Sequence, residues 1–298
     1  MGKSKTQQSQ QDVPPPLPEP LPRPVADSHT HMDMQGRTPA ESVRLAASVN
    51  VTTLVQVGCD VPSSEFAVEQ AAAFGSVHAT VALHPNEAPR LVLGDVDGWA
   101  GRDKHREPGG ATALEAALAR IEELAARPEV VGIGETGLDY FRTGPEGVAA
   151  QQESFRRHIA LAKRVGKALV IHDRDAHADV LRILREEGAP DRVVFHCYSG
   201  DAAMARECAE AGYHLSFAGP VTFKANEELR AALRATPVER VLVETDAPFL
   251  TPVPYRGRPN APYLIPLTVR SMAETLAMDV AELCEALDAN TRRVFELV

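Results

Sequence analysis

The most constraining feature of this sequence is a regular alternation between short β-branched runs and longer runs with helical periodicity. Such alternation predicts parallel strands joined by helical crossovers. Eight strands are predicted, at Val25–His31, Val51–Gly58, Val77–His84, Val130–Glu135, Ala168–His172, Arg192–His196, His214–Ala218 and Arg240–Glu244.

Eight strand–helix alternations in about 274 residues match the natural size of a closed (β/α)8 barrel, the TIM barrel. We therefore predict an α/β protein in which residues 25–298 form one barrel domain. The alternative is an open, doubly wound sheet. Its first and last strands could lie far apart, whereas in a barrel they are neighbours. Both of these strands carry candidate ligands, and this favours the barrel.

Residues 1–24 differ in composition from the rest of the chain, with seven prolines between Pro14 and Pro24. A segment with so little to bury cannot offset its ordering entropy, so we predict a disordered or polyproline-like tail. A passive extension is the favoured interpretation. The alternative is a docking segment for an SH3-like partner.

The net charge of −10 argues against a protein that coats nucleic acid through bulk electrostatics. It does not exclude an enzyme that holds one strand end, since bound cations would offset charge locally. No apolar run has the length of a membrane span, and the four cysteines lack paired spacing. We therefore expect a cytoplasmic protein with no membrane partner and with its cysteines as thiols. The oligomeric state stays open.

Six side chains of metal-binding type follow the predicted strands, each at the C-terminal end. A barrel gathers these strand ends at one face, so the six should converge there. Histidines and carboxylates together are the ligands of a metal-dependent hydrolase. The six predicted ligands are His29, His31, Glu135, His172, His196 and Asp246.

Two of these ligands have further predicted roles. Glu135 lies in a glycine-rich stretch, and its two oxygens could bridge two cations. Asp246 shares a face with Glu244 but lies further out, so we assign it as a ligand that also takes a proton from the attacking water. Asp139 either orients a ligand or caps a turn, and the sequence does not decide between these.

Substrate contacts are predicted beside the ligands. Arg174 lies two residues beyond His172 and could bind a substrate phosphate, or pair with a neighbouring acid. Ser199 lies where a helix begins, and the unpaired N–H groups of a helix start form an anion site. Asp201 in the same turn could be only an N-cap.

Taken in order, the motifs resemble the TatD family of metal-dependent deoxyribonucleases, from about Asp27 to the C-terminus. The departures are the Pro-rich tail and a predicted loop insertion at Leu93–Gly110, on the ligand face. The motifs are His29-x-His31, Leu83-His84-Pro85, Gly134-Glu135-Thr136-Gly137-Leu138-Asp139, His172-x-Arg174, His196-Cys197-Tyr198-Ser199-Gly200, Glu244-Thr245-Asp246-Ala247-Pro248 and Pro254-Tyr255-Arg256-Gly257-Arg258-x-Asn260.

The resemblance implies an amidohydrolase-like barrel with two divalent ions, Mg²⁺, Mn²⁺ or Zn²⁺. His29, His31, Glu135 and Asp246 would hold the first ion, and Glu135 would bridge to a second held by His172 and His196. Glu135 and Asp246 would be the catalytic carboxylates. Arg174, Arg256 and Arg258 would contact phosphates of the substrate.

The activity that the resemblance implies is hydrolysis of DNA phosphodiester bonds, from the 3′ end of single strands. The same barrel could instead cleave small esters, lactones or amides, or act as a D-aminoacyl-tRNA deacylase, because fold and metal site do not decide the substrate. A third hypothesis is a scaffold whose tail recruits a partner. It predicts a dispensable metal site, which six intact ligands make the weakest of the three.

Overall fold

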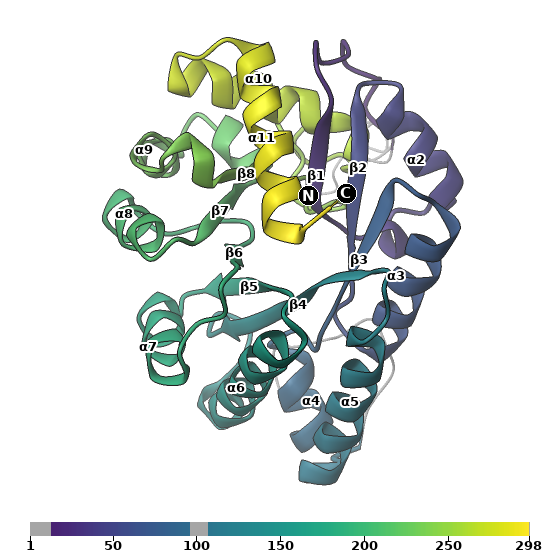
Figure 1. The fold of residues 1–298 in the computed structure, drawn as a ribbon, viewed down its shortest axis with the longest axis vertical. Coiled ribbons are helices and arrows are strands. Elements are labelled where there is room, and N and C mark those ends of the chain that lie inside the picture. The colour runs from purple at the N-terminus through teal and green to yellow at the C-terminus, as the bar shows by residue number, and fades with distance from the viewer. Residues whose placement is uncertain (1–12, 96–106, 298) are drawn as a thin grey trace, which may run out of the picture. The chain divides into compact units, whose positions relative to one another are not determined.

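The computed structural model describes residues 13–95 and 107–297. Its strands belong to one sheet in chain order, and helices alternate with them along the chain (Figure 1). This is a (β/α)8 barrel, as predicted. The strands are β1 (Val25–Thr30), β2 (Val51–Val57), β3 (Val77–Val81), β4 (Val130–Asp139), β5 (Ala168–Arg174), β6 (Val193–Phe195), β7 (His214–Phe217) and β8 (Val241–Val243).

The helices lie largely where helical periodicity places them. The α-helices are α2 (Pro39–Ala47), α3 (Val61–Ala73), α4 (Glu87–Leu93), α5 (Gly110–Ala125), α6 (Val148–Val165), α7 (His177–Glu187), α8 (Ala202–Glu210), α9 (Glu227–Ala235), α10 (Ile265–Leu276) and α11 (Val280–Phe295). Short 3-10 turns are η1 (Met32–Met34), η2 (Pro145–Gly147), η3 (Gly219–Thr222), η4 (Val238–Arg240) and η5 (Pro262–Leu264). No helix in the described ranges is both long and apolar enough to cross a membrane.

The described chain divides into two compact units. Unit 1 is drawn from residues 1–56 and 200–293, and it contains β7, β8, β1 and most of β2. Within it β7 pairs with β8 and β1 pairs with β2, all parallel. The last strand meets the first through a parallel bridge between Thr30 and Ala247. The first and last strands are therefore neighbours, as the barrel prediction requires.

Unit 2 is drawn from residues 57–199 and 294–298 and contains β3, β4, β5 and β6 in parallel register. The β4 strand runs to Asp139, four residues beyond the predicted end at Glu135. Its pairing with β5 shifts register between Ile133 and Thr136. Glu135 therefore lies inside an irregular strand rather than at its end, which corrects the prediction.

The glycines of β4 allow its backbone to lie very close to β5. A Cβ on Gly134 would lie 2.4 Å from the Cβ of Val170. Gly137 has φ +134°, and a Cβ there would lie 2.1 Å from the carbonyl oxygen of His172. Only glycine fits at these two positions, so the glycine-rich motif brings the strand that carries Glu135 against the strand that carries His172.

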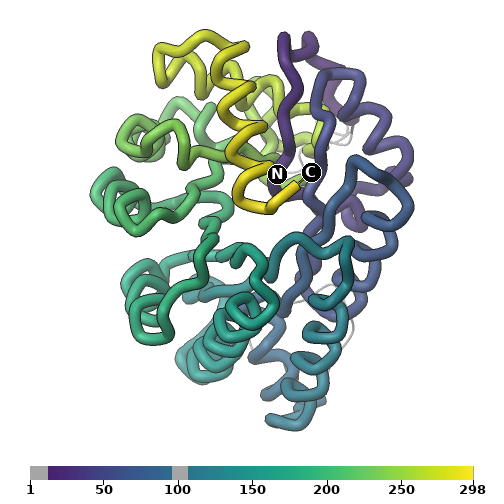
Figure 2. Tube along the Cα trace, viewed as in Figure 1, coloured from purple at the N-terminus to yellow at the C-terminus, as the bar shows by residue number. Residues whose placement is uncertain are grey.

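Residues 13–24 form neither helix nor strand, but they are bonded to the rest of unit 1, so the polyproline-like alternative fits them better than the disordered one. Residues 1–12 of the predicted tail lie outside the described residues. Leu21 is buried and its N–H donates to the carbonyl of Val49, at 3.2 Å. In Figure 2 the purple N-terminal segment lies beside the yellow C-terminal helices, in keeping with the Arg270 hydrogen bonds to the carbonyls of Glu19 and Pro20.

The physical reason is the chemistry of proline. A proline-rich extended segment has no internal hydrogen bonds, so its carbonyls accept from side chains elsewhere. Tyr263 donates to the carbonyl of Pro15 at 2.7 Å, and Arg258 donates to Val13 and Pro14. The partner predicted for this segment stays a prediction.

The predicted insertion at Leu93–Gly110 is also corrected in part. Its first residue ends helix α4, and its last residue begins α5. The charged and glycine-rich composition of this segment predicted a loop at both of these helix ends. Residues 96–106 of the insertion lie outside the described residues.

A buried histidine on α6 joins the helix to the loop after β3. His158 donates from Nδ1 to the carbonyl of Ser154 at 2.7 Å and accepts at Nε2 from the backbone N–H of Leu83 at 3.1 Å. This leaves no place for a second ring proton. Burial lowers the pKa of His158 to about 4. The neutral ring thus positions the residue that precedes His84.

We expect His158 to make stability pH-dependent. Its folded-state pKa lies below the ordinary 6.5, so its contribution is complete above pH 6.5 and is lost as pH falls towards 4. The loss should reach about 3 kcal/mol in the free energy of unfolding. Urea unfolding of His158→Gln should show a shallower fall over this range than the wild type. Equal slopes for the two proteins would contradict the assignment.

Candidate metal centre

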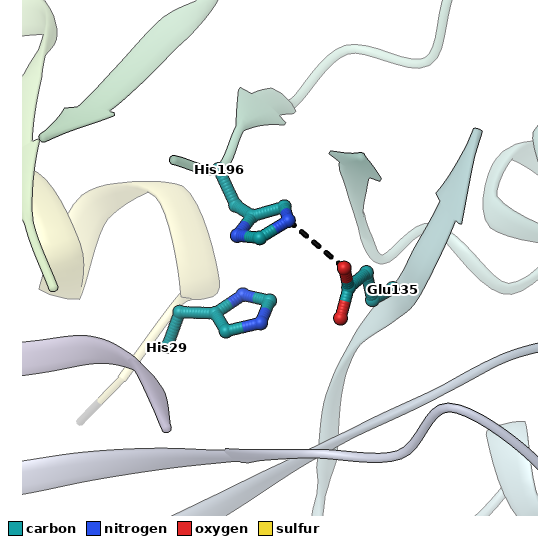
Figure 3. A group of neighbouring side chains, drawn as sticks. All are labelled: His29, Glu135 and His196. Atoms are coloured by element: carbon teal, nitrogen blue, oxygen red, sulfur yellow. Dashed lines mark ion pairs between the residues drawn. The ribbon is translucent and has the colours of Figure 1, made fainter. Parts of the chain in front are cut away.

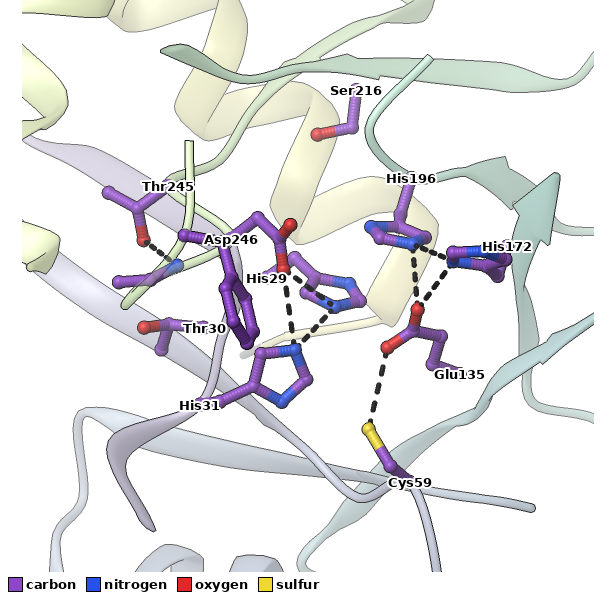
Figure 4. A network of polar contacts seen from close by, with 12 residues as sticks. His29, Thr30, His31, Cys59, Glu135, His172, His196, Ser216, Thr245 and Asp246 are labelled. Carbon is purple, nitrogen blue, oxygen red and sulfur yellow. Dashed lines mark hydrogen bonds and ion pairs between the residues drawn. The ribbon is translucent and has the colours of Figure 1, made fainter. Parts of the chain in front are cut away.

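Unit 1 brings together three of the predicted ligands. The Nε2 atoms of His29 and His31 lie 3.2 Å apart, and Oδ1 of Asp246 lies 3.9 Å from the first and 3.4 Å from the second (Figure 4). Both histidines are buried. Two nitrogen ligands about 2.1 Å from one ion lie roughly 3.0–3.4 Å apart. The spacing of the two imidazoles therefore fits a shared divalent ion.

The backbone places Asp246 by bonding it to the first strand. Its N–H donates to the carbonyl of His29 at 2.9 Å, and its own φ of +51° lies in the left-handed region. Such a conformation in a non-glycine residue costs about 1–3 kcal/mol and is typical of functional sites. Asp27, fully buried, accepts from the Thr245 N–H at 2.9 Å and from its hydroxyl. Burial raises the pKa of Asp27 to about 8.

Unit 2 gathers the other three predicted ligands. Oε1 of Glu135 lies 2.8 Å from Nδ1 of His172 and 2.9 Å from Nε2 of His196, and these two nitrogens are 3.2 Å apart. Figure 3 shows the carboxylate of Glu135 facing the ring of His196. Three donor atoms at these mutual distances match three ligands on one side of a single ion.

A third histidine, His84, joins this cluster and was not assigned from the sequence. Nε2 of His84 lies 3.3 Å from Oε1 of Glu135, and the His84 and His172 rings meet edge to face. His84 follows β3, so its place after a strand was the signal available. Cys59, after β2, also donates its thiol hydrogen to Glu135, at 3.5 Å.

The imidazoles control the charge of Glu135. Burial alone would raise its pKa, but the neighbouring His196 and His84 rings outweigh that and hold the pKa well below its ordinary value. Burial likewise opposes charge on His172, but the hydrogen bonds that its ring donates to Asp139 and Glu135 raise its pKa to about 9. The carboxylate is therefore ionised and ready to bind a cation.

Asp139 contacts the predicted ligand His172 and also caps a turn, so both roles that the sequence left open have a matching contact. Its Oδ2 lies 3.3 Å from Nε2 of His172, so the Nδ1 of that ring faces Glu135. Asn86 donates to the same oxygen at 3.0 Å. Oδ1 accepts from the N–H of Arg142 at 2.9 Å. Carboxylates that hold a ligating histidine in this way set its tautomer and basicity.

Replacing Asp139 by alanine should therefore weaken metal binding without removing a ligand. We expect the affinity of the metal-stripped protein for Zn²⁺ or Mn²⁺ to fall by about 10–100-fold in calorimetric titration. Asp173→Asn is a matched control, since that carboxylate pairs with His177, outside the cluster. An unchanged affinity in Asp139→Ala would show that His172 needs no such support.

The predicted substrate contacts differ in their surroundings. Cζ of Arg174 lies 3.8 Å from the ring centroid of Phe141, and among the described residues its guanidinium makes no ion pair. The Ser199 hydroxyl donates to the carbonyl of Asp173 at 3.2 Å. The carboxylate of Asp201 caps the first N–H groups of α8, so the predicted helix-start anion site is filled by the chain itself.

The two arginines of the loop after β8 are also placed. Arg256 lies over the ring of Phe223, 4.0 Å from its centroid. Arg258 donates to the carbonyls of Val13 and Pro14 at 2.8 and 2.7 Å. Arg258 is thus engaged by the N-terminal segment, which the sequence did not indicate. Their contacts with substrate stay predictions.

Comparison with known proteins places this geometry in a family. Residues 26–296 match the TatD related DNase family. A protein of Mycobacterium tuberculosis described as an uncharacterized metal-dependent hydrolase TatD is 43% identical over 281 residues, which cover 92% of this chain and 98% of that protein. A protein of Musicola paradisiaca named 3′-5′ ssDNA/RNA exonuclease TatD is 32% identical, over 83% of this chain and 88% of that protein.

A solved structure of a TatD homologue has a similar fold. The crystal structure of YjjV, a TatD homologue from Escherichia coli, superposes with a TM-score of 0.79 and 23% identity, over 92% of this chain and 98% of that one. A parallel barrel with histidines and carboxylates clustered near the C-terminal ends of its strands is typical of metal-dependent hydrolases. The chain belongs to the TatD related DNase family.

Proposed function

We propose that this hydrolase cleaves phosphodiester bonds of single-stranded DNA, working from the 3′ end. The observation that carries the proposal is the pair of clusters, His29–His31–Asp246 and Glu135–His172–His196, each with donor atoms at the spacing of ligands on one ion. Family membership and a relative named as a 3′-5′ ssDNA/RNA exonuclease support the substrate.

Two divalent ions are proposed, one at each cluster. When bound, such ions lower the pKa of water and neutralise charge on a phosphate under attack. Imidazole-rich ligand sets favour Zn²⁺ or Mn²⁺, whereas Mg²⁺ prefers oxygen ligands. The metal identity is therefore an experimental question among these three, and the bridging role of Glu135 stays a prediction from the family resemblance.

Three side chains of the protein would accept the proton, position a ligand and bind the substrate. The carboxylate of Asp246 lies beside the His31 ring and would accept the proton of the attacking water. Asp139 would hold the His172 ring so that Nδ1 serves the ion. Arg174, with its donors unused by the described residues, would bind a phosphate that flanks the cleaved bond.

A substrate comparison tests this assignment. We expect the metal-loaded protein to shorten single-stranded DNA that carries a 5′ label, which reports stepwise loss from the 3′ end, and to release a 3′ label at once. Small esters, lactones, amides and a D-aminoacyl-tRNA would be offered in parallel. Turnover of one of these compounds without DNA cleavage would instead assign the site to the alternative hydrolase or deacylase activity.

The cellular setting is also proposed. All four cysteines lie in the described residues, and none of them forms a disulfide. Thiols of this kind suit a reducing compartment, which supports a cytoplasmic protein.

A further inference from the structure

The turn that follows β4 displays an aromatic ring to solvent beside the metal-ligand cluster of unit 2. The Phe141 side chain is 58% exposed, although burying a large apolar side chain would stabilise the folded protein. One face of its ring is covered by the Arg174 guanidinium at 3.8 Å, and Cζ of Arg142 lies 5.9 Å from the centroid. Exposed aromatic rings flanked by arginines are typical of surfaces that bind single-stranded nucleic acid.

The neighbours of Phe141 hold the turn in place. The N–H of Tyr140 donates to the carbonyl of Arg174 at 2.9 Å, and its hydroxyl donates to Asp179 at 2.7 Å. The N–H of Arg142 donates to Asp139 at 2.9 Å. Residues on both sides of Phe141 are thus bonded to the body of unit 2, so its ring projects from a fixed turn rather than from a loose loop.

The cation that stacks on the ring keeps its hydrogen-bond donors available. Two of the nearby acids have other partners, since Asp173 pairs with His177 and Asp179 pairs with Arg182. Arg174 makes no ion pair within the part of the chain that the structure describes. A guanidinium that stacks with its flat face still presents its edge, which suits a phosphate.

The position of this pair relates it to the reaction centre. Phe141 lies two residues beyond Asp139, and Arg174 lies two residues beyond the ligand His172 on the paired strand. Two residues along a strand span about 7 Å. The pair is therefore placed for a nucleotide that adjoins the cleaved bond and not for the cleaved phosphate itself.

We infer that Phe141 and Arg174 form a nucleotide subsite, in which a base of single-stranded DNA stacks on the open face of Phe141 while Arg174 binds that nucleotide's phosphate. The inference rests on the proposed function, because it assigns the substrate to the same site. It adds a reason for the enzyme to prefer single strands, since a base in a duplex is already stacked and paired. A stacked base should strengthen binding about tenfold, which corresponds to about 1.4 kcal/mol.

The test compares a short thymidine oligonucleotide with one whose 3′-terminal nucleotides lack bases. Phe141→Leu should lower kcat/KM for the normal oligonucleotide about tenfold. It should leave cleavage of the base-free oligonucleotide unchanged, together with hydrolysis of methyl p-nitrophenyl phosphate. Phe141→Trp should retain the preference for bases. Arg174→Gln should weaken binding of both oligonucleotides, because the phosphate is present in each.

Phe74→Leu is the matched control, the same exchange at the end of α3 that precedes β3, away from the ligands. Equal effects of Phe141→Leu on both oligonucleotides, or no effect on either, would overturn the proposed subsite. In that case, cleavage of DNA by the wild type would still support the proposed function. If the wild type neither binds nor cleaves either oligonucleotide, the proposed function fails and the subsite fails with it.

Discussion

Replacing Asp246 by asparagine is expected to abolish DNA cleavage while leaving the protein folded. The amide of asparagine has the same shape as the carboxylate but no negative charge, so it would bind a metal ion beside the two imidazoles less well. It also cannot accept a proton from water. General-base catalysis alone contributes about 10²–10⁴-fold, so kcat should fall by at least a hundredfold. The measurement is single-turnover cleavage of labelled single-stranded DNA, with thermal unfolding recorded for the same samples.

Asp201→Asn is the matched control for this variant. Asp201 belongs to the same unit and caps α8, a role that asparagine fills equally well. Its activity and stability should equal those of the wild type. Wild-type turnover in Asp246→Asn would remove the role assigned to Asp246, both as ligand and as proton acceptor.

Glu135→Ala should have the second large effect. The buried carboxylate lies within 3.3 Å of nitrogen atoms on His84, His172 and His196, and it is the anionic member of that group of four. Without it, an ion would face imidazoles alone, and the cluster would lose the charge that attracts a cation. We expect the purified variant to hold at least one ion fewer per chain by elemental analysis and to lose DNA cleavage.

The control for this change is Glu129→Gln, just before the same strand, where the partly exposed carboxylate pairs with Arg127. Its metal content should match the wild type. A full complement of metal in Glu135→Ala would contradict the proposed ligand set, whatever the activity of that variant.

The strands, and the clustering of the side chains predicted as ligands, could be predicted because their signals are local. Each of the eight β-branched runs forms a strand, and the order of strands follows from the rule that parallel crossovers are short and consecutive. Residues two apart on a strand share a face, which is why His29 and His31 meet. The structure brings each of the six predicted ligands beside at least two others within one unit.

The errors lie where long-range contacts decide the structure. The glycines of β4 lower its strand propensity, yet they allow it to continue against β5 as far as Asp139. The segment at residues 13–24 lacks apolar side chains in number, and its order depends on donors such as Tyr263 and Arg270 nearly 250 residues away. The place of His84 in the unit 2 cluster likewise follows from packing, because no spacing rule links it to Glu135.

Metal-dependent hydrolysis of single-stranded DNA is tested by measuring cleavage by the metal-stripped protein after add-back of Mg²⁺, Mn²⁺ or Zn²⁺. The substrate is end-labelled, and Glu135→Ala is run beside the wild type. We predict no cleavage without metal, shortening from the 3′ end with at least one of the ions, and none in the variant. Absence of cleavage with every ion, or equal cleavage by the variant, would show that this metal centre does not hydrolyse single-stranded DNA.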